Sequence, residues 1–292
     1  MKRRQFLSTA AAGTALLSMP KFVLALDKDN AYRNEIGIQL YTLRNEIDKD
    51  VKATLKAVAE AGYKQAEPYG FPNCRPMIEA ANEFGLKLHS SHFNSDSIVN
   101  NDASDDDYFD TVLEKANDVG LTHLVIPYLG DQFRTSLDDY RRVCANCNKA
   151  AEKAKAAGIQ LSYHNHAFEF KPLEDGKCGY DVMIEEFSPD MKFELDVFWV
   201  EVGGVNTIEL MSKLGSRISQ LHLKDLDASV KTPSYDGVPK EAFKEIGNGV
   251  INIEAIIEAA GEHGIAHCHV EQDQSPNALA SIKQSMEALK KM

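Results

Sequence analysis

Four side chains with metal-binding chemistry lie near the ends of four successive expected strands in the second half of the chain. They are Glu169 in YHNHAFEF, Asp196 in FELDVFW, His222 in QLHLKD and Glu271 in HVEQD. Carboxylate and imidazole groups are common ligands of divalent cations. Three carboxylates held close together would repel one another and raise at least one pKa unless a cation neutralised them. The pattern therefore predicts a site for one divalent metal ion, with Mn²⁺, Co²⁺, Mg²⁺ and Zn²⁺ as candidates.

The elements that must bring these residues together follow from a recurring feature of the sequence. Helical stretches end at a glycine that precedes a short apolar run, as in AGYKQAE, FGLKLHS, VGLTHLVIP, AGIQLSYHNH and HGIAHCHVEQ. We expect eight strands, at 36–41, 63–67, 86–92, 122–127, 159–164, 192–196, 218–223 and 266–271. Helices are expected between them, including 51–61, 136–157, 253–263 and 277–290. This alternation predicts an α/β fold, a single-domain (β/α)8 TIM barrel over residues 31–292, whose active site lies at the carboxyl ends of its strands.

Two connections of the expected barrel are long. Residues 95–107 follow the third strand and residues 224–252 follow the seventh. Long loops on the catalytic face of a barrel commonly act as lids or specificity loops. The acidic run at 102–107 has Ser104 three residues before Asp107, which favours a helix cap there over a calcium site.

The amino terminus has the pattern of an export signal. Lys2, Arg3 and Arg4 precede an apolar stretch rich in alanine and threonine, and RRQFL resembles a twin-arginine signal. We expect residues 1–25 to be this signal, with cleavage after Ala25 or near Ala15, and a periplasmic location for the mature protein. No other segment has the length and apolar character of a membrane span.

The overall charge argues against some classes of binding partner. A formal net charge of −12 at 292 residues argues against binding to nucleic acid or to an anionic membrane surface, because the negative field would repel both. No phosphate-binding GxGxxG motif and no arginine cluster follows the seventh or eighth strand. Together with the expected periplasmic location, the missing phosphate-binding motif favours an unphosphorylated small molecule as the partner, and a homo-oligomeric state is left open.

Further polar residues are expected on the rim that carries the metal site. His164 and His166 alternate along the fifth strand, so both are expected to face the pocket, as substrate contacts or as a hydrogen-bond partner of a ligand carboxylate. Lys224, just after the seventh strand, is expected to stabilise an enolate oxygen, with Asp225 as its ion-pair partner. The remaining candidates for hydroxyl binding are Gln39, Glu67 and His92.

Several segments together resemble the xylose-isomerase-like TIM barrels that include sugar phosphate isomerases and epimerases. These segments are GIQLYTLR, YHNHAFEF, LDVFWV, GGVNTIEL, RISQLHLKD, IGNGVINI and VEQD. The resemblance implies Glu169, Asp196, His222 and Glu271 as the metal ligands. It also implies that Glu169 and Glu271 exchange the proton of the substrate carbon. Related ketose epimerases carry a histidine where this chain has Trp199, which replaces a polar substrate contact with an apolar stacking face.

The predicted function is that of a metal-dependent sugar isomerase or epimerase that removes a proton next to a carbonyl group. Loss of a leaving group from the same intermediate would instead give a keto-glycoside lyase or a dehydratase. A non-catalytic carbohydrate-binding barrel is the alternative from another class. The charge and the single ligand set argue against an abasic-site endonuclease.

Overall fold

The computed structural model describes residues 35–100 and 106–292, and these form a nearly closed parallel barrel. The predicted export signal and the expected helix cap at Ser104 lie outside the described residues. The barrel strands are β1 (Gly37–Gln39), β2 (Gln65–Glu67), β3 (Lys87–Leu88), β4 (Ser90–His92), β5 (His123–Ile126), β6 (Gln160–His164), β7 (Met191–Asp196), β8 (Ile218–Leu223) and β11 (Cys268–Val270).

The strand order closes the sheet on itself. Neighbouring strands run β3-β2-β1-β11-β8-β7-β6-β5-β4, and every neighbouring pair in this sheet is parallel. β3 and β4 at the two ends of this order are separated only by His89, so they form the one strand expected at 86–92. The prediction of a single-domain TIM barrel is confirmed.

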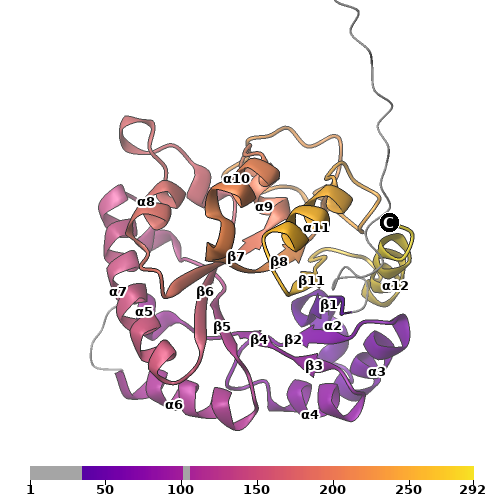
Figure 1. The fold of residues 1–292 in the computed structure, drawn as a ribbon. Helices are drawn as coiled ribbons and strands as arrows, with labels where there is room; N and C mark the ends of the chain where they lie inside the picture. Colours follow the sequence, from indigo (N-terminus) through magenta and orange to yellow (C-terminus); the bar gives the residue numbers. More distant parts are fainter. Residues whose placement is uncertain (1–34, 101–105) are drawn as a thin grey trace, which may run out of the picture.

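Helices surround the strands, as the ring in Figure 1 shows. They are α2 (Arg44–Ile47), α3 (Val51–Ala61), α4 (Arg75–Glu83), α5 (Asp96–Asn100), α6 (Asp106–Asp118), α7 (Leu137–Ala156), α8 (Gly179–Glu186), α9 (Val197–Val202), α10 (Thr207–Leu214), α11 (Ile253–Glu262) and α12 (Ala278–Leu289). Local signals fix their ends. Asp50 caps α3 by accepting the Ala53 N–H at 3.0 Å, and Gly62 ends the same helix with a φ of 109°. No helix in the described part of the chain is long and apolar enough to cross a membrane.

The barrel interior is polar, although the layer between strands and helices is apolar. In β6 the outward side chain of Tyr163 packs near Phe187, whereas the inward Ser162 lies 2.8 Å from Ser219 of β8. Further buried polar residues of this interior are Gln39, Glu67, Ser90, Glu194, Gln220 and His269. Buried polar groups are costly unless they find partners, so the interior must be held by a hydrogen-bond network.

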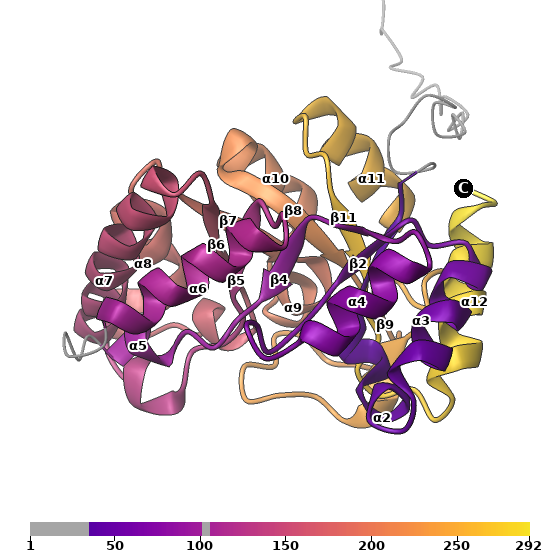
Figure 2. The ribbon, with the colours of Figure 1, turned by 90° about the horizontal axis from the view of Figure 1, so that it is seen from below.

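The long connections fold over the carboxyl ends of the strands. After β8 the chain forms β9 (Asp225–Leu226), which pairs antiparallel with β10 (Phe243–Lys244). Asp225 organises this region, because its carboxylate accepts the N–H groups of Gly247, Gly249 and Ile251 at 2.9, 2.9 and 3.1 Å. In Figure 2 the elements that follow β1, β7 and β8, namely α2, α9 and β9, lie on the lower side of the barrel. The long loop expected after the third strand, at 95–107, includes the short helix α5.

Three histidines lie together at the opposite, amino-terminal end of the barrel, and we expect them to make the fold sensitive to acid. The ring of His89 is stacked on that of His267 and lies 4.1 Å from that of His123, centroid to centroid. Burial lowers the pKa of His123 and that of His267 to about 4. Below pH 6.5 these two imidazoles therefore bind protons in the unfolded chain but remain neutral in the folded chain. Stability is lost as the pH falls from 6.5 to about 4, by up to about 3 kcal/mol for the more deeply buried His123 and by less for His267, whose charge solvent partly screens.

Urea unfolding at pH 7 and pH 4.5 measures this loss. The variant His267→Gln should lose less free energy of unfolding between the two pH values than the unmodified protein. An equal loss in both proteins would show that the histidine group does not carry the acid sensitivity.

Candidate metal centre and cavity

Four side chains from four strand ends form a compact ligand group. The group consists of His164 at the end of β6, Asp196 at the end of β7, His222 in β8 and Glu271 just after β11. One nitrogen or oxygen atom from each lies within 4.8 Å of those of the others, and all four side chains are buried. Two carboxylates and two imidazoles at this spacing are a suitable ligand set for a divalent cation.

Glu169, expected as a ligand and as a proton-transfer residue, does not belong to this group. It lies in a short 3-10 helix (Phe168–Phe170), five residues beyond the end of β6, and its carboxylate is buried. One carboxylate oxygen accepts the Tyr163 hydroxyl at 2.7 Å, and the other accepts the His166 N–H at 2.8 Å. Tyr163 points outward from the barrel, so Glu169 is held behind the strand. We therefore replace Glu169 by His164 in the candidate ligand set.

The bonding of Asp196 supports a cation at this position. Its oxygen Oδ1 accepts the Trp199 N–H at 2.9 Å and thereby caps α9. Its other oxygen, Oδ2, is buried without a hydrogen-bond partner. That oxygen lies 3.8 Å from His164 Nε2 and 3.2 Å from Lys224 Nζ. Lys224 offsets part of the charge of this oxygen, but the oxygen accepts no hydrogen bond, so a bound cation would stabilise it further.

Lys224 supplies a fixed positive charge beside the ligand group. Its ammonium lies 2.8 Å from Glu271, 2.8 Å from Asp273 and 3.2 Å from Asp196. Burial alone would lower the pKa of Lys224, but these three carboxylates raise it well above its usual value. Burial and the nearby Glu271 raise the pKa of Asp273 to about 6. The expected pairing with Asp225 is wrong, because Asp225 binds backbone N–H groups of the loop after β10.

Two predicted substrate contacts, Glu67 and Gln39, lie beneath the ligand group and outside the cavity. Neither side chain is exposed, and Gln39 Nε2 donates to Glu67 Oε2 at 2.8 Å. The same Glu67 oxygen lies 2.7 Å from His222 Nε2. Both residues therefore belong to the hydrogen-bond network of the barrel interior. Their position deep in the barrel follows from the stagger of β1 and β2 against β8.

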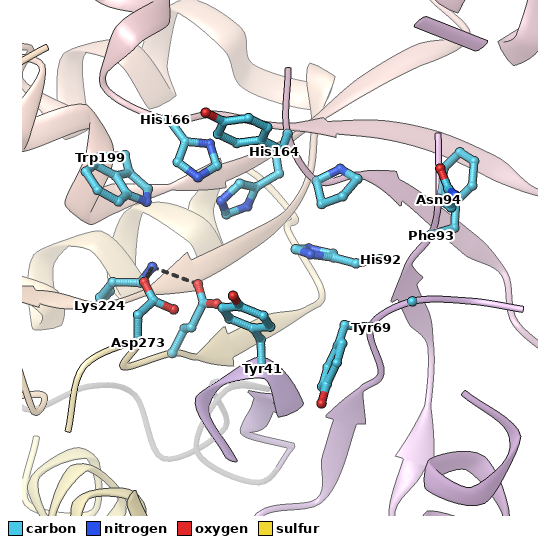
Figure 3. A pocket seen from close by; sticks show the side chains of 14 residues that line it. Tyr41, Tyr69, His92, Phe93, Asn94, His164, His166, Trp199, Lys224 and Asp273 are labelled. Carbon is cyan, nitrogen blue, oxygen red and sulfur yellow. Dashed lines mark hydrogen bonds and ion pairs between the residues drawn. The ribbon is translucent and has the colours of Figure 1, made fainter. Parts of the chain in front are cut away.

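A cavity of about 400 Å³ opens above the ligand group. Predicted site residues on its wall are His92, His164, His166, Trp199, Lys224 and Glu271. Figure 3 shows Tyr41 and Tyr69 on one side of this cavity and His166 and Trp199 on the other. The His166 ring lies 5.2 Å from the Trp199 ring and has a buried Nδ1 without a partner. Burial lowers the pKa of His166 well below its usual value, so its imidazole is neutral.

Several residues of the site and of the barrel interior beneath it were missed in the sequence, although a signal for some of them was present. Glu194 and His269 lie two residues before Asp196 and Glu271, and period-two alternation puts each pair on the same inward face. Counting from the strand end would likewise have selected His164 over Glu169. For Tyr41, Tyr128 and Asp273, which follow β1, β5 and β11, the sequence contains no comparable signal.

Glu169 should control how stability depends on pH. Burial raises the pKa of its carboxyl to about 8. The protonated form is therefore favoured in the folded protein, and its contribution is complete below pH 4.5 and lost as the pH rises to about 8. We expect Glu169→Gln to have little effect at pH 5 and to raise the free energy of unfolding by up to about 5 kcal/mol at pH 8.5.

Denaturant unfolding at the two pH values checks this prediction. Parallel pH profiles for the two proteins would contradict it. The same variant should bind divalent metal as tightly as the unmodified protein, since Glu169 lies outside the ligand group. A large loss of metal affinity would restore Glu169 as a ligand.

The chain is similar in sequence and in structure to several known proteins. A family model described as "Xylose isomerase-like TIM barrel" matches residues 55–292. An inosose dehydratase from Clostridium beijerinckii is 22% identical over 281 residues, which cover 91% of this chain and 90% of that protein. A sugar phosphate isomerase/epimerase from Parabacteroides distasonis is similar in structure, with a TM-score of 0.72, 27% identity and coverage of 89% of this chain and 98% of that one.

Two further solved structures share the fold at lower identity. The 3-keto-D-glucoside 4-epimerase from E. coli has a TM-score of 0.66 at 14% identity, covering 88% of this chain and 99% of its own. The IOLI protein, whose structure holds a zinc atom, has a TM-score of 0.66 at 16% identity, covering 87% and 96%. At these identities the likeness concerns the fold alone.

Proposed function

The chain belongs to the xylose isomerase-like TIM barrel family, and from that premise we propose that it is a divalent-metal-dependent enzyme acting on a carbohydrate. The proposed reaction begins with removal of a proton from a carbon next to a carbonyl group, and isomerisation or epimerisation is the leading outcome. The observation that carries the proposal is the group of His164, Asp196, His222 and Glu271, buried at the base of an open cavity. Relatives that are isomerases, epimerases and dehydratases are consistent with this chemistry.

The four residues of the group would hold the cation. When bound, it would act as a Lewis acid that makes the hydrogen next to a carbonyl more acidic. Lys224, which stays protonated, would stabilise the negative charge that develops on a substrate oxygen. Glu271 and the neutral His166 line the cavity and offer proton acceptors on its wall.

Export is also part of the proposal. The RRQFL segment supports a twin-arginine signal and a periplasmic location, where an unphosphorylated carbohydrate is the more accessible substrate.

Incubation of the metal-loaded protein in D2O tests the proposed reaction. Free sugars and keto-glycosides are supplied as substrates, and NMR follows the carbon next to the carbonyl. Deuterium at that carbon in recovered sugar is expected. The absence of both exchange and product across both substrate sets would contradict the proposal. In the variant Glu271→Gln exchange should vanish, whereas retained sugar binding without any turnover in the unmodified protein would indicate a non-catalytic binding barrel.

A second outcome, β-elimination from a keto-glycoside, is favoured by the aromatic mouth of the cavity. Tyr41 and Tyr128 line it, and with 43% and 48% of their surface exposed they offer ring area to a bound group. With Trp199 they could pack against an apolar leaving group. An unsaturated product in the D2O experiment would identify this reaction. The variant Tyr128→Ala should then raise KM for glycosides with an apolar aglycone and leave KM for free sugars unchanged.

A further inference from the structure

Two carboxylates, Glu67 and Glu194, are buried directly beneath the candidate ligand group. Glu67 ends β2, and Glu194 lies two residues before Asp196 in β7. Neither side chain is exposed, and neither lines the cavity, so neither can contact a substrate there. Glu194 contacts both histidines of the ligand group, and Glu67 contacts His222.

The two histidines present opposite ring nitrogens to these carboxylates. His164 turns Nδ1 to Glu194 Oε2 at 2.9 Å, and its Nε2 faces the unsatisfied oxygen of Asp196. His222 does the reverse. Its Nε2 lies 2.7 Å from Glu67 Oε2 and 3.1 Å from Glu194 Oε1, whereas its Nδ1 faces Glu271 Oε2 at 3.1 Å.

A neutral imidazole carries its proton on one nitrogen only, and a carboxylate fixes which one by accepting that N–H. The other nitrogen then has a free lone pair for a metal, and such partners strengthen metal binding. We propose that Glu67 and Glu194 are positioning residues that hold the two histidine ligands in opposite tautomers. The metal would then be bound by Nε2 of His164 and Nδ1 of His222. This inference rests on the metal centre of the proposed function.

The surroundings of Glu194 require a group that only accepts hydrogen bonds. Besides His164, its oxygens accept from His92 Nε2 at 2.7 Å and from Gln220 Nε2. Glu67 has a similar set of donors, from Gln39, Ser90 and Gln220. An amide at position 194 would place an NH2 group among donors. His164 Nδ1 could then become an acceptor, which would move its proton to the nitrogen that faces the metal.

The tautomers can be observed in the unmodified protein, without any variant of the two carboxylates. The protein is loaded with Zn²⁺ and labelled with ¹⁵N at histidine, and long-range ¹H–¹⁵N correlation spectra identify the protonated and the metal-bound nitrogen of each ring. Separate His164→Gln and His222→Gln variants assign the signals. We expect His164 to be protonated at Nδ1 and zinc-bound at Nε2, and His222 to show the opposite arrangement. The same nitrogen bound in both rings would overturn the inference.

A matched pair of variants measures the effect on binding. Glu194→Gln should weaken zinc binding roughly 10- to 100-fold in a chelator competition. The control Glu201→Gln makes the same chemical change on α9, where the carboxylate binds Thr207 and contacts no ligand, and it should bind zinc normally. Undiminished zinc affinity in Glu194→Gln would contradict the proposal. If that variant fails to fold, the spectra of the unmodified protein still decide the question.

The histidine tautomers and the proposed reaction are tested by different measurements, so either one can fail without the other. Correct tautomers in a protein without sugar-exchange activity would support the inference and contradict the function. Active protein with the wrong tautomers would do the opposite. A protein that does not bind zinc at all would contradict both.

Discussion

Replacement of His222 by alanine is expected to abolish tight metal binding and to destabilise the fold at the same time. In the folded protein this one ring contacts the carboxylates of Glu67, Glu194 and Glu271. Removing it leaves buried carboxylates facing one another without their partner, which typically costs about 3–5 kcal/mol of the free energy of unfolding. The affinity for Zn²⁺ should fall more than about 100-fold, because a direct ligand matters more than its hydrogen-bond partners. Denaturant unfolding and chelator competition measure the two losses.

His269 provides a matched control for this variant. It is an equally buried histidine of the barrel interior, in β11, but both of its ring nitrogens lack hydrogen-bond partners. His269→Ala should cost only the packing of one ring and leave the affinity for Zn²⁺ nearly unchanged. Equal effects of the two substitutions on metal affinity would show that the position of His222 in the ligand group has no special importance.

The second large effect is expected from Lys224→Met. This variant should lose activity without losing affinity for the metal. The methionine retains the length of the side chain but leaves Asp196, Glu271 and Asp273 without their shared cation. The rate should fall roughly 100- to 10,000-fold, as expected for loss of a group that stabilises charge or donates a proton. Affinity for a divalent cation should not fall, because the uncompensated carboxylates attract it more strongly. Initial rates in the D2O exchange assay and Zn²⁺ titration measure the two quantities.

Lys224→Arg separates charge from geometry. The guanidinium retains the positive charge but cannot occupy the space of a compact ammonium. We expect reduced exchange and a loss of stability from overpacking, since Lys224 is buried, while the positive charge between the carboxylates is retained. A Lys224→Met variant with full exchange activity would exclude Lys224 from the reaction.

Gln272 and Asp273 connect the rim to the segment that follows β1. The backbone N–H of Gln272 donates to Thr42 Oγ1 at 3.1 Å, and its side chain donates to the Phe243 carbonyl oxygen at 3.3 Å. Arg44 adds a bond of 2.7 Å to the Asp273 carbonyl oxygen. The segment that carries Glu271 and Asp273 is therefore held between α2 and β10. Such support favours a site whose side chains are in place before substrate binds.

The sequence alone determined the architecture and the kind of chemistry. Glycine-terminated helices followed by apolar runs marked five of the eight strands, and the apolar pattern marked the other three, because both signals are local. Asp196, His222 and Glu271 were also found, since each lies at or near the end of a strand, and the fold brings all such ends to one face. The resemblance to the family rested on the same segments.

Only the tertiary structure decided which residues belong to the ligand group and how deep in the barrel each side chain lies. Glu169 and His164 lie five residues apart, and the chain turns behind β6 between them, so the nearer residue enters the cluster and the farther one is held by Tyr163. Gln39 and Glu67 lie at strand ends like the true ligands, but the tilt and stagger of the strands place them below the cavity, against His222. Side-chain direction alternates with each residue, and depth depends on the register between strands far apart in the chain. The depth is therefore not encoded in a single local pattern.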